Sequence, residues 1–160
     1  MRSWMFKMEN ELKQLLEDWK TMHQLTLDLL DELPEEHLGF TVGKNMGTIG
    51  KQYRHMGDVQ ICYNEAIKTG KADFNKYKRD YSLEGSKEKL KSFLEEVNDE
   101  MLKLIEKNSD VKINWFGEEW NLKQHIKALI EHEILHHGEL VVYIRTLGIK
   151  FPKSWELWGL

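Results

Sequence analysis

Long stretches of helical periodicity, uninterrupted by proline, most constrain how this 160-residue chain can fold. Its two prolines, Pro34 and Pro152, both lie outside the periodic segments, so the backbone of those segments is free to be α-helical. Apolar residues recur in four separate segments at steps of three and four, which is the spacing of one helix face. The sequence therefore predicts an all-α domain in which four helices bury these faces against one another.

The first predicted helix covers residues 3–32, and the second covers residues 49–69, between the N-cap Thr48 and Gly70. The connection that follows, over residues 71–85, is long for a helix–helix loop and predicts a crossover that spans the bundle. The fold class is thus a four-helix bundle with a long crossover connection. The inward-facing positions are Met8, Leu12, Leu15, Trp19, Met22, Thr26, Leu29 and Leu33 in the first helix, and Gln52, His55, Val59, Cys62 and Ala66 in the second.

The third predicted helix follows Ser86 and ends near Lys107, and residues 108–120 alternate weakly, as in a short extended loop or hairpin. The fourth helix begins at a capping box headed by Asn121 and ends at Gly148. The inward-facing positions are Leu90, Leu94, Val97, Met101 and Leu104 in the third helix, and Leu122, His125, Leu129, His132, His136 and Tyr143 in the fourth.

The tail, residues 149–160, contains Trp155, Leu157 and Trp158 and is too apolar to stay in solvent. We expect it to cap one end of the bundle or to pack against a second subunit. The length of the chain suits one domain, residues 1–160.

Composition argues against several classes of protein. A net charge of −4, with 23 basic residues interspersed among 27 acidic ones, is not the footprint of a nucleic-acid-binding protein. The sequence has no apolar run of the roughly 20 residues that a membrane span needs. Cys62 is the single cysteine, and the N-terminal residues do not resemble a signal peptide, so we expect a cytoplasmic protein without disulfides.

Two histidines of the fourth helix, His132 and His136, are four residues apart and therefore project from one face. An imidazole in a core needs hydrogen-bond partners, and a shared metal ion satisfies two rings at once. His55 lies on the inward face of the second helix and is the best candidate for a third ligand. The sequence therefore predicts one divalent metal ion held by His55, His132 and His136. Imidazole ligands suit zinc, nickel, copper and ferrous iron alike, so the residues do not identify the metal.

Three further residues are candidates for the surroundings of this site. His125 lies two turns, about 10 Å, from His132, which predicts a structural or supporting role. Glu133 points away from His132 on the helix and is interpreted as a supporting partner or a surface charge. His137 is expected to face outward or toward the rim of the site, and His23, His37 and Cys62 are interpreted as structural.

The chain resembles the DinB/YfiT-like family in two segments: MGTIGKQYRHMGDV, which contains His55, and HEILHHGEL, which begins at His132. His55, His132 and His136 match the three ligand positions of that family. The resemblance implies a four-helix bundle with a long crossover, often dimeric, that binds zinc or nickel and leaves coordination positions open; iron or manganese remain possible metals. The chain differs from the family pattern at His137, where arginine is common, and at Leu135, where a further histidine is frequent.

The resemblance also implies a function, since members of known activity are chiefly metal-dependent thiol transferases that use bacillithiol, mycothiol or glutathione. The residues alone support a metal-activated nucleophile, either a thiol or water, acting on a small electrophilic substrate. We therefore expect a metal-dependent thiol transferase or small-molecule hydrolase that forms a homodimer. The alternative is a non-catalytic stress or structural protein whose metal only clamps two helices together.

A third interpretation is a zinc peptidase, because residues 132–136 also spell the motif H-E-x-x-H. In such an enzyme Glu133 would be the general base, and Glu156, twenty residues beyond His136, would supply the third ligand. Two features argue against a peptidase: Glu156 lies in the tryptophan-rich tail, and no strands precede the motif to hold a peptide.

Overall fold

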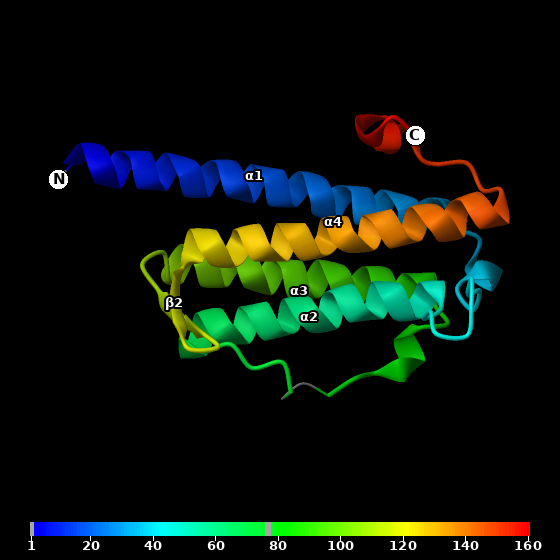
Figure 1. The fold of residues 1–160 in the computed structure, drawn as a ribbon, viewed down its shortest axis with the longest axis horizontal. Helices are drawn as coiled ribbons and strands as arrows, with labels where there is room; N and C mark the ends of the chain where they lie inside the picture. Colours follow the sequence, from blue (N-terminus) through cyan, green and yellow to red (C-terminus); the bar gives the residue numbers. More distant parts are fainter. Residues whose placement is uncertain (1, 76–77) are drawn as a thin grey trace.

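The computed structural model describes residues 2–75 and 78–160, with side chains described from residue 10 onward, so the predicted core position Met8 lies outside the described side chains. Four long helices form the bundle, and α1 and α4 run in one direction while α2 and α3 run in the other (Figure 1). This arrangement confirms the predicted four-helix bundle with a long crossover. The helices are α1 (Arg2–Glu32), α2 (Ile49–Thr69), α3 (Lys87–Lys107) and α4 (Leu122–Leu147).

The helix ends lie where the local sequence signals predict them. The hydroxyl of Thr48 accepts a hydrogen bond from the backbone N–H of Lys51 at the start of α2. Asn121 and Gln124 bond to each other's backbone N–H groups at 3.0 Å, which completes the predicted capping box of α4. Gly70 and Gly148 end α2 and α4 with φ values of 70° and 69°, a conformation that glycine adopts without strain.

The long connection between α2 and α3 carries the chain back along the bundle, so that these two helices are parallel neighbours (Figure 1). Residues 76–77 of the predicted crossover lie outside the described residues. Its far end, near the short helix η2 (Tyr81–Leu83), is fixed to α2 by the buried Arg54, which donates a 2.7 Å hydrogen bond to Glu84 and also pairs with Asp58. The contact is close, since a Cβ at Gly50 would lie 2.0 Å from the carbonyl oxygen of Glu84.

The predicted hairpin between α3 and α4 is present as β1 (Lys112–Trp115) paired antiparallel with β2 (Glu118–Asn121). It packs Trp115 against Tyr63 and His125 at one end of the bundle, with ring centroids 5.2 and 5.5 Å apart. The core between the helices contains most of the predicted inward-facing residues. Those buried in it are Trp19, Met22, Thr26, Leu29 and Leu33 from α1, Gln52, Val59, Cys62 and Ala66 from α2, Leu90, Leu94, Val97 and Met101 from α3, and Leu122, His125, Leu129, His136 and Tyr143 from α4.

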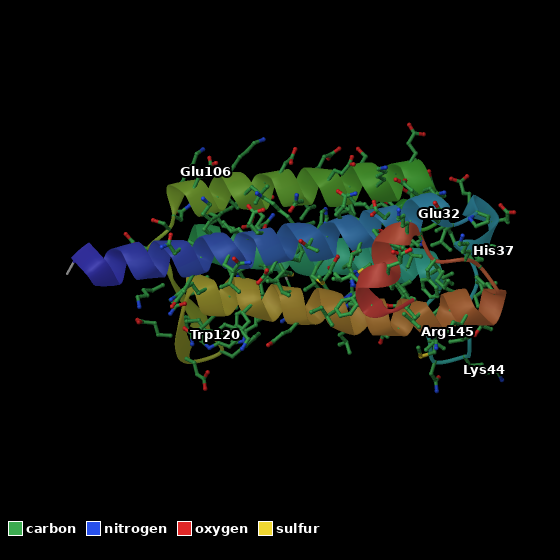
Figure 2. The ribbon with its side chains drawn as sticks, turned by 90° about the horizontal axis from the view of Figure 1, so that it is seen from above. Glu32, His37, Lys44, Glu106, Trp120 and Arg145 are labelled. Atoms are coloured by element: carbon green, nitrogen blue, oxygen red, sulfur yellow. The ribbon has the colours of Figure 1, made fainter. Side chains whose placement is uncertain are left out.

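One of the two predictions for the tail, that it caps an end of the bundle, is wrong. A glycine-terminated turn at Gly148 reverses the chain, and the short helix η3 (Lys153–Trp158) lies over the side of α1 and α4 (Figure 2). Trp155 is fully buried there and donates its indole N–H to the carbonyl of Leu25 at 2.9 Å. No helix in the described part of the chain is long and apolar enough to cross a membrane.

Candidate metal centre

The fold brings His55, His132 and His136 together between α2 and α4. One ring nitrogen from each lies within 4.8 Å of the others, and the Nε2 atoms of His132 and His136 are 3.1 Å apart. The ring of His55 lies 4.9 Å from that of His136 and 5.4 Å from that of His132, measured between centroids. Three imidazoles from two facing helices thus converge on one point.

A carboxylate orients one of these rings. Nδ1 of His136 lies 2.8 Å from Oε2 of Glu139, and its N–H donates a hydrogen bond to that carboxylate oxygen. The other ring nitrogen, Nε2 of His136, faces Nε2 of His132. Glu139 was not among the predicted site residues, although its position three residues after His136 on the same helix is a recognisable signal.

The electrostatics keep the rings of His55 and His132 neutral. Burial lowers the pKa of His55 to about 4, with further contributions from His136 and Arg54. Burial, His136 and His55 lower the pKa of His132 to about 3. At neutral pH both rings are therefore uncharged and available as ligands, since only the unprotonated nitrogen of imidazole binds a metal.

The spacing of the three nitrogens suits a divalent ion. Zinc–imidazole bonds of about 2.0–2.1 Å place two tetrahedral ligand nitrogens roughly 3.4 Å apart. The 3.1 Å separation of His132 and His136 is close to that value, and one nitrogen from each of the three rings lies within 4.8 Å of the others. The residues present therefore fit a metal ion.

His125 does not belong to this cluster. Its ring is buried near the hairpin, and its Nε2 lies 3.0 Å from the backbone carbonyl of Tyr63, to which it donates. This contact agrees with the structural interpretation of His125 made from the sequence.

Glu133 and His137 lie on a side of α4 that α1 and the tail cover, which the sequence did not predict. His137 is buried against α1 and the tail rather than directed outward, and Glu133 is buried rather than a surface charge. The hydroxyl of Thr26 donates to the Glu133 carboxyl group and lies 2.8 Å from Nε2 of His137. Burial raises the pKa of Glu133 to about 7. The surface-charge interpretation of Glu133 and the outward direction of His137 are therefore wrong, because α1 and η3 cover this side of α4.

The arrangement also bears on the peptidase interpretation. Glu156 is exposed on η3, and in the described residues the histidine pair is joined by His55 and not by Glu156. The carboxyl group of Glu133 is hydrogen-bonded to Thr26, on the α1 side of the helix, where it does not face the cluster. Neither carboxylate is placed as H-E-x-x-H chemistry requires.

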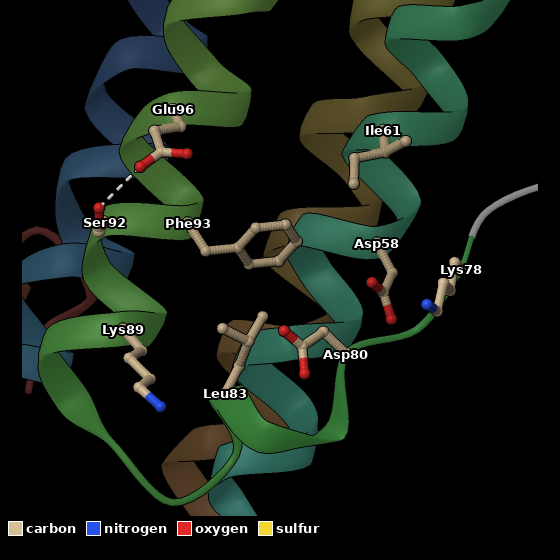
Figure 3. A pocket seen from close by; sticks show the side chains of 9 residues that line it. All are labelled: Asp58, Ile61, Lys78, Asp80, Leu83, Lys89, Ser92, Phe93 and Glu96. Carbon is tan, nitrogen blue, oxygen red and sulfur yellow. Dashed lines mark hydrogen bonds between the residues drawn. The ribbon is translucent and has the colours of Figure 1, made fainter.

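A separate hollow of about 310 Å³ lies between α2, the crossover and α3 (Figure 3). Its charged groups are mixed in sign, and none of the three clustered histidines lines it, so it is not the candidate metal centre. The lining residues are Asp58, Ile61, Lys78, Asp80, Leu83, Lys89, Ser92, Phe93 and Glu96.

The fold and the site together define a class of protein: a four-helix bundle with a long crossover and a three-histidine cluster between two facing helices. The sequence model of the DinB family matches residues 8–158, and the chain belongs to that family. No curated protein matches the chain.

Two solved structures share the fold. A DinB-like protein from Bacillus cereus superposes with a TM-score of 0.73 at 20% identity, covering 88% of this chain and 95% of that one. A DinB-like protein from Bacillus subtilis gives a TM-score of 0.68 at 18% identity, covering 88% of this chain and 97% of that one.

Proposed function

We propose that the chain binds one divalent metal ion through His55, His132 and His136 and acts as a metal-dependent enzyme of the thiol S-transferase class. The observation that carries the proposal is the convergence of three imidazoles, one of them oriented by a carboxylate. Zinc or nickel is the proposed metal, with iron or manganese as alternatives, and the proposed location is the cytoplasm, in keeping with the single, unpaired cysteine.

The residues have separable roles in this proposal. The three imidazoles would hold the ion, and Glu139 would keep the His136 ring in the tautomer that presents Nε2 to it. An ion with open coordination positions supplies Lewis acidity, which lowers the pKa of a bound thiol or water at neutral pH. The ring of His55 is half-buried rather than sealed, which favours access by a small substrate. Membership in the DinB family supports transfer of a low-molecular-weight thiol, such as bacillithiol, to an electrophile.

The activity can be tested with bacillithiol, mycothiol or glutathione and the electrophile monochlorobimane. We expect zinc- or nickel-loaded protein to raise the conjugation rate above that of buffer, and chelation to lower that increase by about 10-fold or more, because the nucleophile loses its activation. Reloading the metal should restore the rate. A protein that binds the ion yet adds nothing to the rate with any of the three thiols would favour the non-catalytic alternative, in which the metal clamps α2 to α4.

Removal of the Glu139 carboxylate tests its orienting role. We expect Glu139→Ala to weaken metal affinity by about 10–100-fold, the usual cost of losing a partner that orients a histidine ligand. Glu139→Gln keeps an oxygen acceptor for the Nδ1–H of His136 and should lose much less. Competition with a chromophoric chelator measures both affinities. Equal affinities for the wild type and Glu139→Ala would show that Glu139 has no such role.

A further inference from the structure

A buried polar network joins α1 to α4 beside the candidate metal centre. The hydroxyl of Thr26 on α1 donates to the carboxyl group of Glu133 and lies 2.8 Å from Nε2 of His137. All three side chains are buried, with exposed fractions of 0%, 3% and 2%. A hydroxyl can donate one hydrogen bond and also accept, so Thr26 can bond both groups at the same time. One atom of α1 therefore holds two side chains of α4 that lie one helical turn apart.

The two partners of Thr26 are the sequence neighbours of two proposed metal ligands. Glu133 follows His132, and His137 follows His136, so each lies about 100° around the helix from its neighbour. The ligand pair faces α2, while the other pair faces α1, which lies along α4 (Figure 1). Thr26 consequently holds the same stretch of α4 that carries His132 and His136.

The orientation of His137 depends on this network. Within the described residues, Nδ1 of His137 has no hydrogen-bond partner, so the contact with Thr26 supplies the hydrogen bonding of this ring. Trp155 of η3 packs against the same ring, with centroids 5.0 Å apart. A buried polar group that loses its partner is strongly unfavourable, so loss of the Thr26 hydroxyl favours a shift of α4.

A metal site is sensitive to small rotations of a helix that carries two of its ligands. The tip of a side chain lies about 6 Å from the helix axis, so a rotation of about 10° moves it by about 1 Å. Metal–ligand distances tolerate a variation of only about 0.2 Å. A rotation too small to unfold the bundle can therefore separate His132 and His136 from the position that a shared ion needs.

We propose that Thr26 is a positioning residue of the metal centre, which fixes the rotation of α4 at which His132 and His136 converge with His55. Thr26 supplies no ligand and acts through its two partners on α4. The inference rests on the proposed function, because it requires that the three histidines bind a metal ion. It adds that α1, a helix without a proposed ligand, controls the affinity for that ion.

Thr26→Val removes the hydroxyl and keeps the size and branching of the side chain. We expect its affinity for zinc, measured by competition with a chromophoric chelator, to be weaker than that of the wild type by about 10-fold or more. Thr26→Ser should stay within about 3-fold of the wild type, since serine offers the same donor and acceptor. Cobalt(II) gives a second readout, because its visible absorption depends on ligand geometry. Thr26→Val should change that spectrum, and Thr26→Ser should preserve it.

A purely structural role of Thr26 would lower stability and leave both readouts unchanged. Val97→Ala is the matched control, because it truncates a buried side chain of α3, which carries no proposed ligand. It should lower the melting temperature and preserve the affinity and the cobalt spectrum, measured where circular dichroism shows each variant folded. Wild-type affinity in folded Thr26→Val would overturn the inference alone, whereas a wild type that binds no metal would overturn the proposed function itself.

Hydrogen exchange of the wild-type protein tests the same coupling if Thr26→Val does not fold. Because coupling between sites is reciprocal, metal loading should slow backbone exchange in α1 around Thr26 more than in α3. Equal slowing in the two helices, or no slowing in α1, would contradict the inference.

Discussion

Replacing His132 with alanine is expected to reduce bound metal from about one ion per chain to less than about one tenth, and His55→Ala is expected to do the same. Each variant removes one of the three proposed ligands, and the loss of an orienting partner alone costs about 10–100-fold in metal affinity, so the loss of a ligand should cost more. The measurement is metal content by inductively coupled plasma mass spectrometry, after loading with zinc or nickel and removal of free ion.

Two controls make this result specific. His37→Ala removes a partly exposed histidine outside the cluster, and Glu156→Ala removes the carboxylate of the peptidase interpretation; both should keep the ion. Loss of the ion from Glu156→Ala with retention in His55→Ala would reverse the assignment and restore the peptidase interpretation. A wild-type protein that takes up no metal would mean that the three histidines serve only the core.

The second large effect is on stability, and it concerns the tail. We expect Trp155→Ala to lower the free energy of unfolding by about 3–5 kcal/mol, the usual cost of truncating a fully buried aromatic side chain. The variant empties the space between α1, α4 and η3, and it removes the hydrogen bond from the indole to the Leu25 carbonyl. Urea denaturation followed by circular dichroism gives the value.

Trp158→Ala is the matched control, because it removes the same side chain from the same short helix. Trp158 is 41% exposed, so its loss should cost less than about 1 kcal/mol. Should the two variants prove equally stable, the placement of η3 against α1 would be wrong.

Several features of this fold could be read directly from the sequence because their causes are local. The ends of α2 and α4 depend on Thr48, Gly70, Asn121 and Gly148, whose contacts all lie within a few residues in the chain. The crossover was predictable from its length, because the connection over residues 71–85 is long enough to join two parallel helices. Convergence of His55 on the pair in α4 was predicted from its place on an inward face and from the family resemblance.

The burial of Glu133 and His137, and the place of the tail, were not predictable in this way. Helical spacing places Glu133 about 100° from His132 and His137 about 100° from His136, but it does not show what covers that side of the helix. Glu139, which orients His136, was overlooked for a related reason: a partly exposed carboxylate on a helix resembles an ordinary surface charge until its contact is seen.

The sequence by itself thus determined the helices, their inward faces and the crossover, since periodicity and capping act over one or two turns. The meeting of the three histidines was inferred from these faces together with the family resemblance. Only the tertiary structure decided that Thr26 on α1 bonds Glu133 and approaches His137, and that Trp155 reaches back to Leu25. These contacts join residues more than 100 positions apart, and their energies depend on how whole helices pack rather than on any local pattern.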